Sequence, residues 1–127
     1  MLNKPIKIGV IGVGHLGIHH VKHYNNLDNT ILIGIHDIDI VRGEEIANKY
    51  AIKFFLDLKT LIKNVDAVSI VTTTTHHFEI AKLCIKNKRH VFIEKPITVT
   101  LEDADELIKL SNKYGVIIQV GHIERLN

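Results

Sequence analysis

A glycine-rich turn lies between a buried strand and a helix near the start of the chain, and few folds accommodate that combination. Ile6–Ile11 is an almost continuous apolar run rich in β-branched residues, which is typical of a strand buried on both faces. Residues 12–17 have the sequence G-V-G-H-L-G, which fits G-x-G-x-x-G, and a helical pattern follows to about Asn26. In such a turn the first glycine permits the bend, the second lets the backbone approach a diphosphate, and the third lets the helix pack on the strand. We therefore predict a dinucleotide-binding turn; the alternative is a glycine-rich turn in an α/β protein that binds no nucleotide.

The rest of the chain repeats this alternation of strands and helices. Asp39 and Thr100 are N-cap residues of two predicted helices, and Gly115 is the C-cap glycine of the second. Strands that alternate with helices form right-handed βαβ units and hence a parallel sheet covered on both sides. We predict a single α/β domain over residues 1–127, a Rossmann-type, doubly wound, six-stranded sheet in the order 3-2-1-4-5-6 within three αβα layers. The further strands are expected at residues 30–36, 53–56, 66–72, 90–93 and 116–120, and the helices at 40–50, 58–63, 76–87 and 101–114.

Composition and charge exclude several classes of protein. The chain has 127 residues, enough for one domain, and is 46% hydrophobic, so extended disorder is not expected. Sixteen basic and fourteen acidic residues give a net charge of +2 without the basic clusters of a nucleic-acid-binding protein. The apolar runs are too short to span a membrane, and residues 1–5 contain no apolar signal region. We expect a cytoplasmic protein that binds neither nucleic acid nor membranes, and its one cysteine, Cys84, is expected in the core.

Asp37 ends the second predicted strand, 25 residues after Gly12. A carboxylate at this point of a dinucleotide-binding fold accepts hydrogen bonds from both hydroxyls of the adenosine ribose. The 2′-phosphate of NADP would place like charge against it, so the sequence favours NAD over NADP.

Two polar segments follow the fourth and fifth predicted strands, at the edge of the sheet where ligands of such folds lie. Thr72, Thr73, Thr74 and Thr75 precede two histidines, and their hydroxyls can hold phosphate or ribose; a β-prone run that ends in a helix cap is the alternative. The second segment is E-K-P at residues 94–96, where a lysine can exchange a proton with a carbonyl or alcohol and the glutamate can orient it. The alternative for this segment is a surface ion pair in a turn.

Histidines at every fourth position raise the question of a metal site. His15, His19 and His23 share one helical face, but no cysteine or carboxylate stands at matching spacing. We predict a solvated helical face and no metal.

Taken together, the motifs resemble the N-terminal domain of the Gfo/Idh/MocA oxidoreductases. The glycine turn and the histidine three residues after it, His20, are similar to the opening of that family. Residues 37–39 resemble its D-x-D element and 71–77 its A-T-P-T-x-x-H loop, with Thr73 in place of the usual proline. E-K-P is a signature of the family, and residues 120–127 resemble its V-G-x-x-x-R-F-N segment, in a form similar to members that act on nucleotide-linked amino sugars.

The resemblance implies a function and a set of site residues. The family transfers hydride between NAD and a secondary hydroxyl of a sugar, inositol or nucleotide sugar, with the E-K-P lysine, here Lys95, as the catalytic acid/base. The cofactor contacts that it implies, together with those from the motifs, are Gly12, Val13, Gly14, His15, Leu16, Gly17, Asp37, Ile38, Arg42, Thr72, Thr73, Thr74, His77, Glu94, Lys95 and Pro96.

The resemblance also bears on what this chain does alone. Family members continue with a substrate-binding domain that supplies a D-x-x-x-H pair, whereas this sequence ends at Asn127. We therefore expect a fragment, a truncated gene product or a standalone module that binds cofactor without turnover and that can self-associate. The alternative function is a non-catalytic NAD-sensing or partner-binding module.

Overall fold

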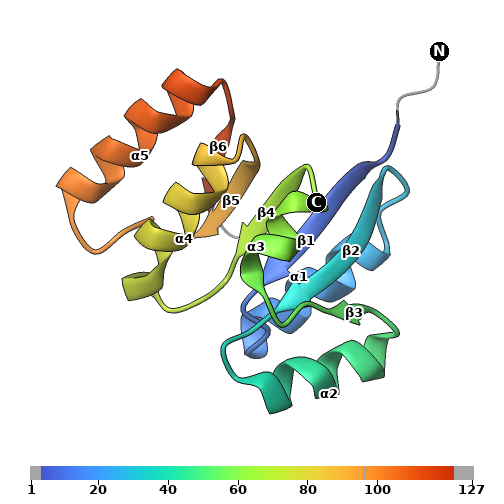
Figure 1. Cartoon of the computed structure of the whole chain (residues 1–127). Helices are drawn as coiled ribbons and strands as arrows, with labels where there is room; N and C mark the ends of the chain where they lie inside the picture. Colours follow the sequence, from blue (N-terminus) through green and yellow to red (C-terminus); the bar gives the residue numbers. More distant parts are fainter. Residues whose placement is uncertain (1–3, 96, 122–127) are drawn as a thin grey trace.

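The computed structural model describes residues 4–95 and 97–121, which form one parallel sheet with helices on both faces (Figure 1). The six strands follow the order β3-β2-β1-β4-β5-β6, as predicted. The strands are β1 (Ile6–Ile11), β2 (Thr30–His36), β3 (Lys53–Phe54), β4 (Ala67–Ile70), β5 (His90–Glu94) and β6 (Ile118–Gly121). The helices are α1 (His15–Asn25), α2 (Ile40–Tyr50), α3 (Leu58–Lys63), α4 (Thr74–Lys86) and α5 (Leu101–Tyr114).

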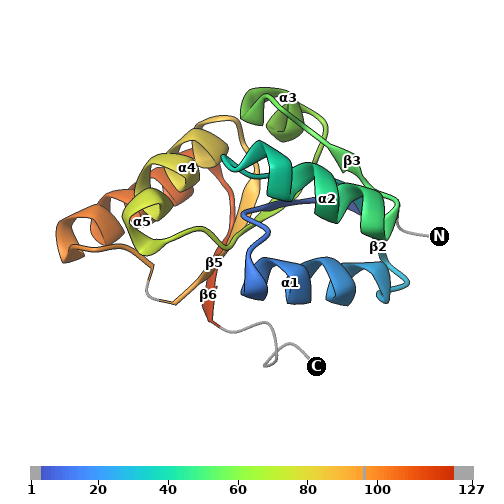
Figure 2. The ribbon, with the colours of Figure 1, turned by 90° about the horizontal axis from the view of Figure 1, so that it is seen from below.

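Two hydrophobic clusters fill the space between the sheet and its helices. Because side chains alternate across a strand, Val10 and Ile11 of β1 enter different clusters. One cluster includes residues of α1 and α2, and the other includes residues of α3, α4 and α5. Figure 2 shows α1 on the opposite side of the sheet from α4 and α5. These clusters produce the predicted three layers.

Several helix ends have the caps that the sequence predicts. The side chain of Asp39 accepts a hydrogen bond from the backbone N–H of Arg42, and Thr100 accepts one from that of Asp103. Gly115 has a φ of 70° at the end of α5, a left-handed conformation that glycine adopts without strain. Within the part of the chain described, no helix is both long and apolar enough to cross a membrane.

Four predicted boundaries are wrong by two residues. β3 ends at Phe54 rather than at 56, since it lies at the sheet edge and pairs over only two residues. β4 ends at Ile70 rather than at 72, and α4 begins at Thr74 rather than at 76. Thr73 is the N-cap of α4, so the helix overrides the β propensity of the threonine run. β6 begins at Ile118 rather than at 116.

Candidate functional site

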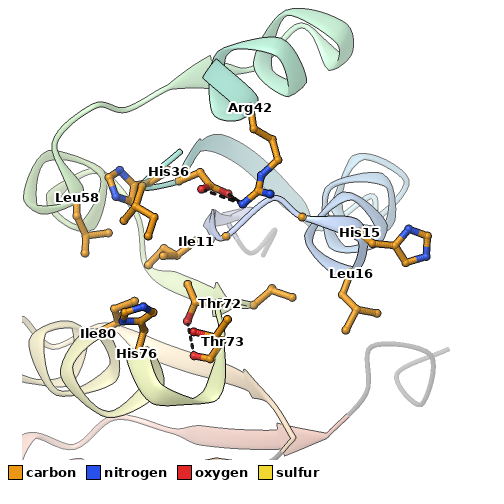
Figure 3. Close-up of a pocket in the computed structure, with 15 residues that line it drawn as sticks. Ile11, His15, Leu16, His36, Arg42, Leu58, Thr72, Thr73, His76 and Ile80 are labelled. Carbon is orange, nitrogen blue, oxygen red and sulfur yellow. Dashed lines mark hydrogen bonds and ion pairs between the residues drawn. The ribbon is translucent and has the colours of Figure 1, made fainter. Parts of the chain in front are cut away.

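A pocket of about 560 Å³ opens at the carboxyl ends of β1, β2 and β4 (Figure 3). The direction of strand succession in the sheet reverses between β1 and β4, which is where ligands of doubly wound folds bind. Figure 3 shows Arg42 on one side of the pocket and Thr72 and Thr73 on the other. The lining residues are Ile11, Gly12, Gly14, His15, Leu16, His36, Asp37, Ile38, Arg42, Leu58, Val71, Thr72, Thr73, His76 and Ile80.

The three glycines of the turn differ in how much space there is for a side chain. Gly12 has a φ of 95°, and a Cβ there would come within 2.8 Å of the carbonyl oxygen of Val71. A Cβ at Gly17 would overlap the carbonyl oxygen of Gly12, because α1 closes tightly on the end of β1. At Gly14, by contrast, a Cβ would meet nothing within 4 Å. The turn therefore leaves open space at the N-terminus of α1, whose first amides lack intrahelical partners and favour an anion.

Asp37 lies at the pocket with its carboxylate almost fully buried. One carboxylate oxygen, Oδ2, accepts a hydrogen bond of 2.8 Å from the backbone N–H of Val13 in the glycine turn. The other, Oδ1, accepts one of 2.8 Å from the backbone N–H of Asp39. The guanidinium of Arg42 donates to both oxygens, at 3.3 Å to Oδ1 and 3.2 Å to Oδ2. The Asp37 side chain thus joins the end of β2 to the glycine turn.

The threonine loop is held by a buried histidine. His77 has 1% of its surface exposed, and its Nε2 lies 3.0 Å from the carbonyl oxygen of Thr72. Its Nδ1 lies 3.2 Å from the carbonyl oxygen of Ile97, in the loop after β5. His77 therefore positions the Thr72 backbone without lining the pocket itself, and Thr74 is the first residue of α4.

The E-K-P segment ends β5 at the same edge of the sheet. Lys95 is exposed and does not line the pocket, whereas Glu94 is buried. Oε1 of Glu94 lies 2.8 Å from Nε2 of His20 in α1. Pro96 and residues 122–127 of the predicted C-terminal motif lie outside the described residues.

The His20–Glu94 pair belongs to a cluster of buried polar residues that the sequence analysis did not identify as a cluster. His20 is fully buried, and among the described residues its Nδ1 has no hydrogen-bond partner. Burial lowers the pKa of His20, an effect that its hydrogen bond to Glu94 partly opposes. The hydroxyls of Tyr24 and Ser69 lie 2.6 Å apart nearby, and burial raises the pKa of Tyr24. The available signal was the helical spacing of His20 and Tyr24, which places both on the face of α1 that packs on the sheet.

Nine of the predicted cofactor residues line the pocket, and the six others that the structure describes do not. Val13 and Gly17 are buried beneath the turn, where they shape it. The pocket also has six lining residues that sequence analysis did not select, mostly apolar side chains at strand ends and on α3 and α4. Apolar residues at such positions have no signal that separates them from the core. These six residues are Ile11, His36, Leu58, Val71, His76 and Ile80.

The histidines on the exposed face of α1 form no cluster with other ligands. The rings of His15 and His19 lie edge to face with centroids 5.1 Å apart. Over residues 4–95 and 97–121, no group of three or more histidine, cysteine, aspartate or glutamate side chains is arranged to hold a metal ion.

Known proteins share both this sequence and this fold. Residues 6–122 match the profile of the Gfo/Idh/MocA family, described as "Oxidoreductase family, NAD-binding Rossmann fold". UDP-N-acetylglucosamine 3-dehydrogenase of Acidithiobacillus ferrooxidans is 38% identical over 122 residues, covering 96% of this chain and 38% of that protein. A solved structure of that enzyme superposes with a TM-score of 0.89 at 38% identity, over 95% of this chain and 39% of the other. Myo-inositol 2-dehydrogenase of Thermotoga maritima is 37% identical over 125 residues, which is 96% of this chain and 37% of the relative.

The fold and these matches define an NAD-binding Rossmann domain of the oxidoreductase class. The chain belongs to the Gfo/Idh/MocA oxidoreductase family, as its motifs implied. It spans slightly more than a third of the length of the curated relatives that it matches.

Proposed function

We propose that this chain is the cofactor-binding part of a dehydrogenase that transfers hydride between NAD and a secondary hydroxyl of a sugar, inositol or nucleotide sugar. One observation carries the proposal. The buried carboxylate of Asp37 is fixed at the pocket by the backbone of the glycine turn, so the group that recognises ribose and the turn that approaches diphosphate are parts of one unit.

The residues present fit a dinucleotide. The open space at Gly14 and the free amides at the start of α1 suit a diphosphate, and Asp37 suits the ribose diol. Ile38 and Arg42 flank the end of the pocket proposed for adenosine, and Thr72 and Thr73 line the opposite side, in the loop between β4 and α4. The complete proposed set is Gly12, Val13, Gly14, His15, Leu16, Gly17, Asp37, Ile38, Arg42, Thr72, Thr73, Thr74, His77, Glu94, Lys95 and Pro96.

Lys95 is the proposed acid/base. Bound NAD supplies the nicotinamide ring that accepts the hydride from the carbon of the substrate alcohol. As general base, Nζ of Lys95 would take the hydroxyl proton as the carbonyl forms, and the reverse reaction would return that proton. Lys95 follows buried Glu94 at the end of β5, and its side chain is exposed. A non-reacting lysine for comparison is Lys109, which is exposed on α5.

The substrate class comes from the relatives. One is named for UDP-N-acetylglucosamine and another for myo-inositol, and both names describe oxidation of a ring hydroxyl. We propose a polyhydroxylated ring substrate of this kind for the whole enzyme, a cytoplasmic location, and self-association through exposed apolar side chains such as Val99, Leu101 and Ile117.

The first experiment measures cofactor binding. Titration of the purified chain with NADH, followed by cofactor fluorescence, is expected to show saturable one-site binding; the chain has no tryptophan to interfere with the signal. Absence of NADH binding at millimolar concentration contradicts the proposal.

The second experiment measures turnover. We expect the chain with NAD and a panel of inositols, sugars and nucleotide sugars to give no sustained reduction of NAD, since catalysis needs the substrate held in a reactive position. Joining this chain to the substrate domain of the Acidithiobacillus relative is expected to give turnover that Lys95→Ala abolishes and Lys109→Ala leaves intact. If the fusion protein is active and Lys95→Ala does not lower its turnover, the proposed acid/base role of Lys95 is contradicted.

A further inference from the structure

The acceptor capacity of the Asp37 carboxylate is already filled in the structure. A carboxylate has about four lone-pair positions, two on each oxygen. Two accept the backbone N–H groups of Val13 and Asp39 at 2.8 Å, and the other two accept hydrogen bonds from Nη2 of Arg42 at 3.2 and 3.3 Å. A ribose diol that bonds to this carboxylate therefore needs one of these donors to leave.

Arg42 is the donor that can leave. The two backbone donors are fixed by the glycine turn and by the start of α2, whereas the Arg42 side chain is 48% exposed. Its two contacts come from a single nitrogen and exceed the 2.7–2.9 Å that is usual for charge-assisted hydrogen bonds. A half-exposed ion pair of this kind is weak, so its displacement costs a ligand no more than about fivefold in affinity.

The position of Arg42 after displacement also matters. Its backbone N–H is held by the Asp39 side chain at 3.1 Å, so the residue stays at the pocket while its guanidinium swings. Among the described residues that line the pocket, Arg42 is the one arginine or lysine (Figure 3). The extra phosphate of NADP would face the negative charge of Asp37, and the displaced guanidinium is the group placed to neutralise it.

We propose that Arg42 is a specificity-determining residue that opposes Asp37: it competes with the ribose diol of NAD for the carboxylate, and it supplies the cation that lets the pocket accept a 2′-phosphate. The inference rests on the proposed dinucleotide function. It implies that NADH and NADPH respond to the loss of Arg42 in opposite directions.

The test is titration of the full chain with NADH and with NADPH, for the unmodified protein, Arg42→Ala and Arg42→Gln. We expect either substitution to raise the affinity for NADH about two- to fivefold and to lower the affinity for NADPH roughly tenfold. Lys49→Ala is the matched control, because it removes one positive charge from an exposed position on the same helix. It is expected to leave the NADH-to-NADPH ratio unchanged.

Three outcomes overturn the proposal. Weaker binding of both cofactors in the Arg42 variants would make Arg42 an ordinary attractive contact. A changed ratio in Lys49→Ala would assign the effect to general charge. Failure of the unmodified chain to bind either cofactor overturns the proposed function as well, whereas in the first two outcomes the proposed function stands.

Discussion

At the scale of single residues, the most firmly held polar group at the proposed site is one carboxylate. Asp37 has 4% of its surface exposed and is bonded to two backbone amides, so its charge is fixed in place at the pocket. A buried, preorganised acceptor discriminates between ligands more sharply than a mobile surface group, because it does not reorganise when the ligand arrives.

Asp37→Ala tests this acceptor directly. We expect the free energy of NADH binding to weaken by about 1.5–3 kcal/mol, the worth of a hydrogen-bonded charge. NADPH affinity is expected to stay the same or rise, because the like charge facing its 2′-phosphate is removed, so the affinities of the two cofactors become more alike. Asp37→Asn keeps the shape and loses the charge, and calorimetry of both variants separates packing from charge. Tighter binding of NADPH than NADH by the unmodified chain would contradict the prediction.

The buried histidine of α1 predicts a pH dependence of stability. The pKa of His20 lies below its unfolded value of about 6.5, mainly through burial, although Glu94 faces it and opposes the shift while His19 and His23 add to it. The unfolded chain therefore takes up this proton first as the pH falls. The contribution of His20 is fully present above about pH 6.5 and decreases below it, by up to about 1.4 kcal/mol per pH unit.

Urea unfolding between pH 5 and 8 measures this slope. We expect the unfolding free energy of His20→Gln to fall less steeply below pH 6.5 than that of the unmodified chain. The difference between the two curves isolates His20 from the eight other histidines. Parallel curves would show that His20 does not change its protonation on unfolding.

At the scale of elements, the glycine turn separates a folding requirement from a binding requirement. A side chain at Gly17 meets backbone, whereas one at Gly14 points into open space. The same chemical change at two positions three residues apart is therefore expected to have different effects.

Gly17→Ala is expected to lower the free energy of unfolding by about 1–3 kcal/mol, as overpacking does. Gly14→Ala is expected to change the free energy of unfolding by no more than about 0.5 kcal/mol, since the φ of −69° at Gly14 suits alanine. The same substitution is expected to lower the affinity for NADH at least tenfold, because the added methyl group fills the space proposed for the diphosphate. Thermal melts and NADH titrations of both variants provide the check. Full NADH affinity in Gly14→Ala would exclude this turn as the diphosphate site.

The elements were predictable from the sequence to different degrees. β1 and β2 were predicted to the residue from their apolar, β-branched runs. The bounds of α2 and α5 also agree with the prediction, because Asp39, Thr100 and Gly115 mark their ends. In the threonine run the predicted strand was too long and the predicted helix began too late, since β propensity extends through these residues whereas α4 begins at Thr74. For the site, glycines and Asp37 have recognisable spacing, but Leu58 and Ile80 reach the pocket through tertiary structure alone. The partnership of His20 with Glu94 spans 74 positions, a contact that no local pattern encodes.

At the scale of the whole molecule, all the polar groups of the proposed site lie at one edge of the sheet. Because the strands are parallel, their carboxyl ends all lie at that edge, and residues far apart in the sequence meet there. The hydrophobic layers lie beneath it and provide a rigid support, and the proposed ligand contacts add little to the core. Ligand binding and folding are therefore linked by mass action rather than by shared packing.

Because Cys84 is buried, the rate at which its thiol is chemically modified can be used to measure how ligand binding affects unfolding. This residue is the chain's one cysteine, has no exposed surface within α4, and has a pKa raised by burial to about 12. Only a thiolate reacts rapidly with disulfide reagents, so the folded form is expected to be inert and each modification to record an opening of the larger core cluster. NADH at one hundred times its Kd is expected to slow labelling roughly a hundredfold, measured by mass spectrometry over time. Rapid labelling at a rate that NADH does not change would mean that α4 opens locally. Slow labelling that NADH slows further would mean that the labelling rate of this one sulfur atom reports the opening of the entire domain.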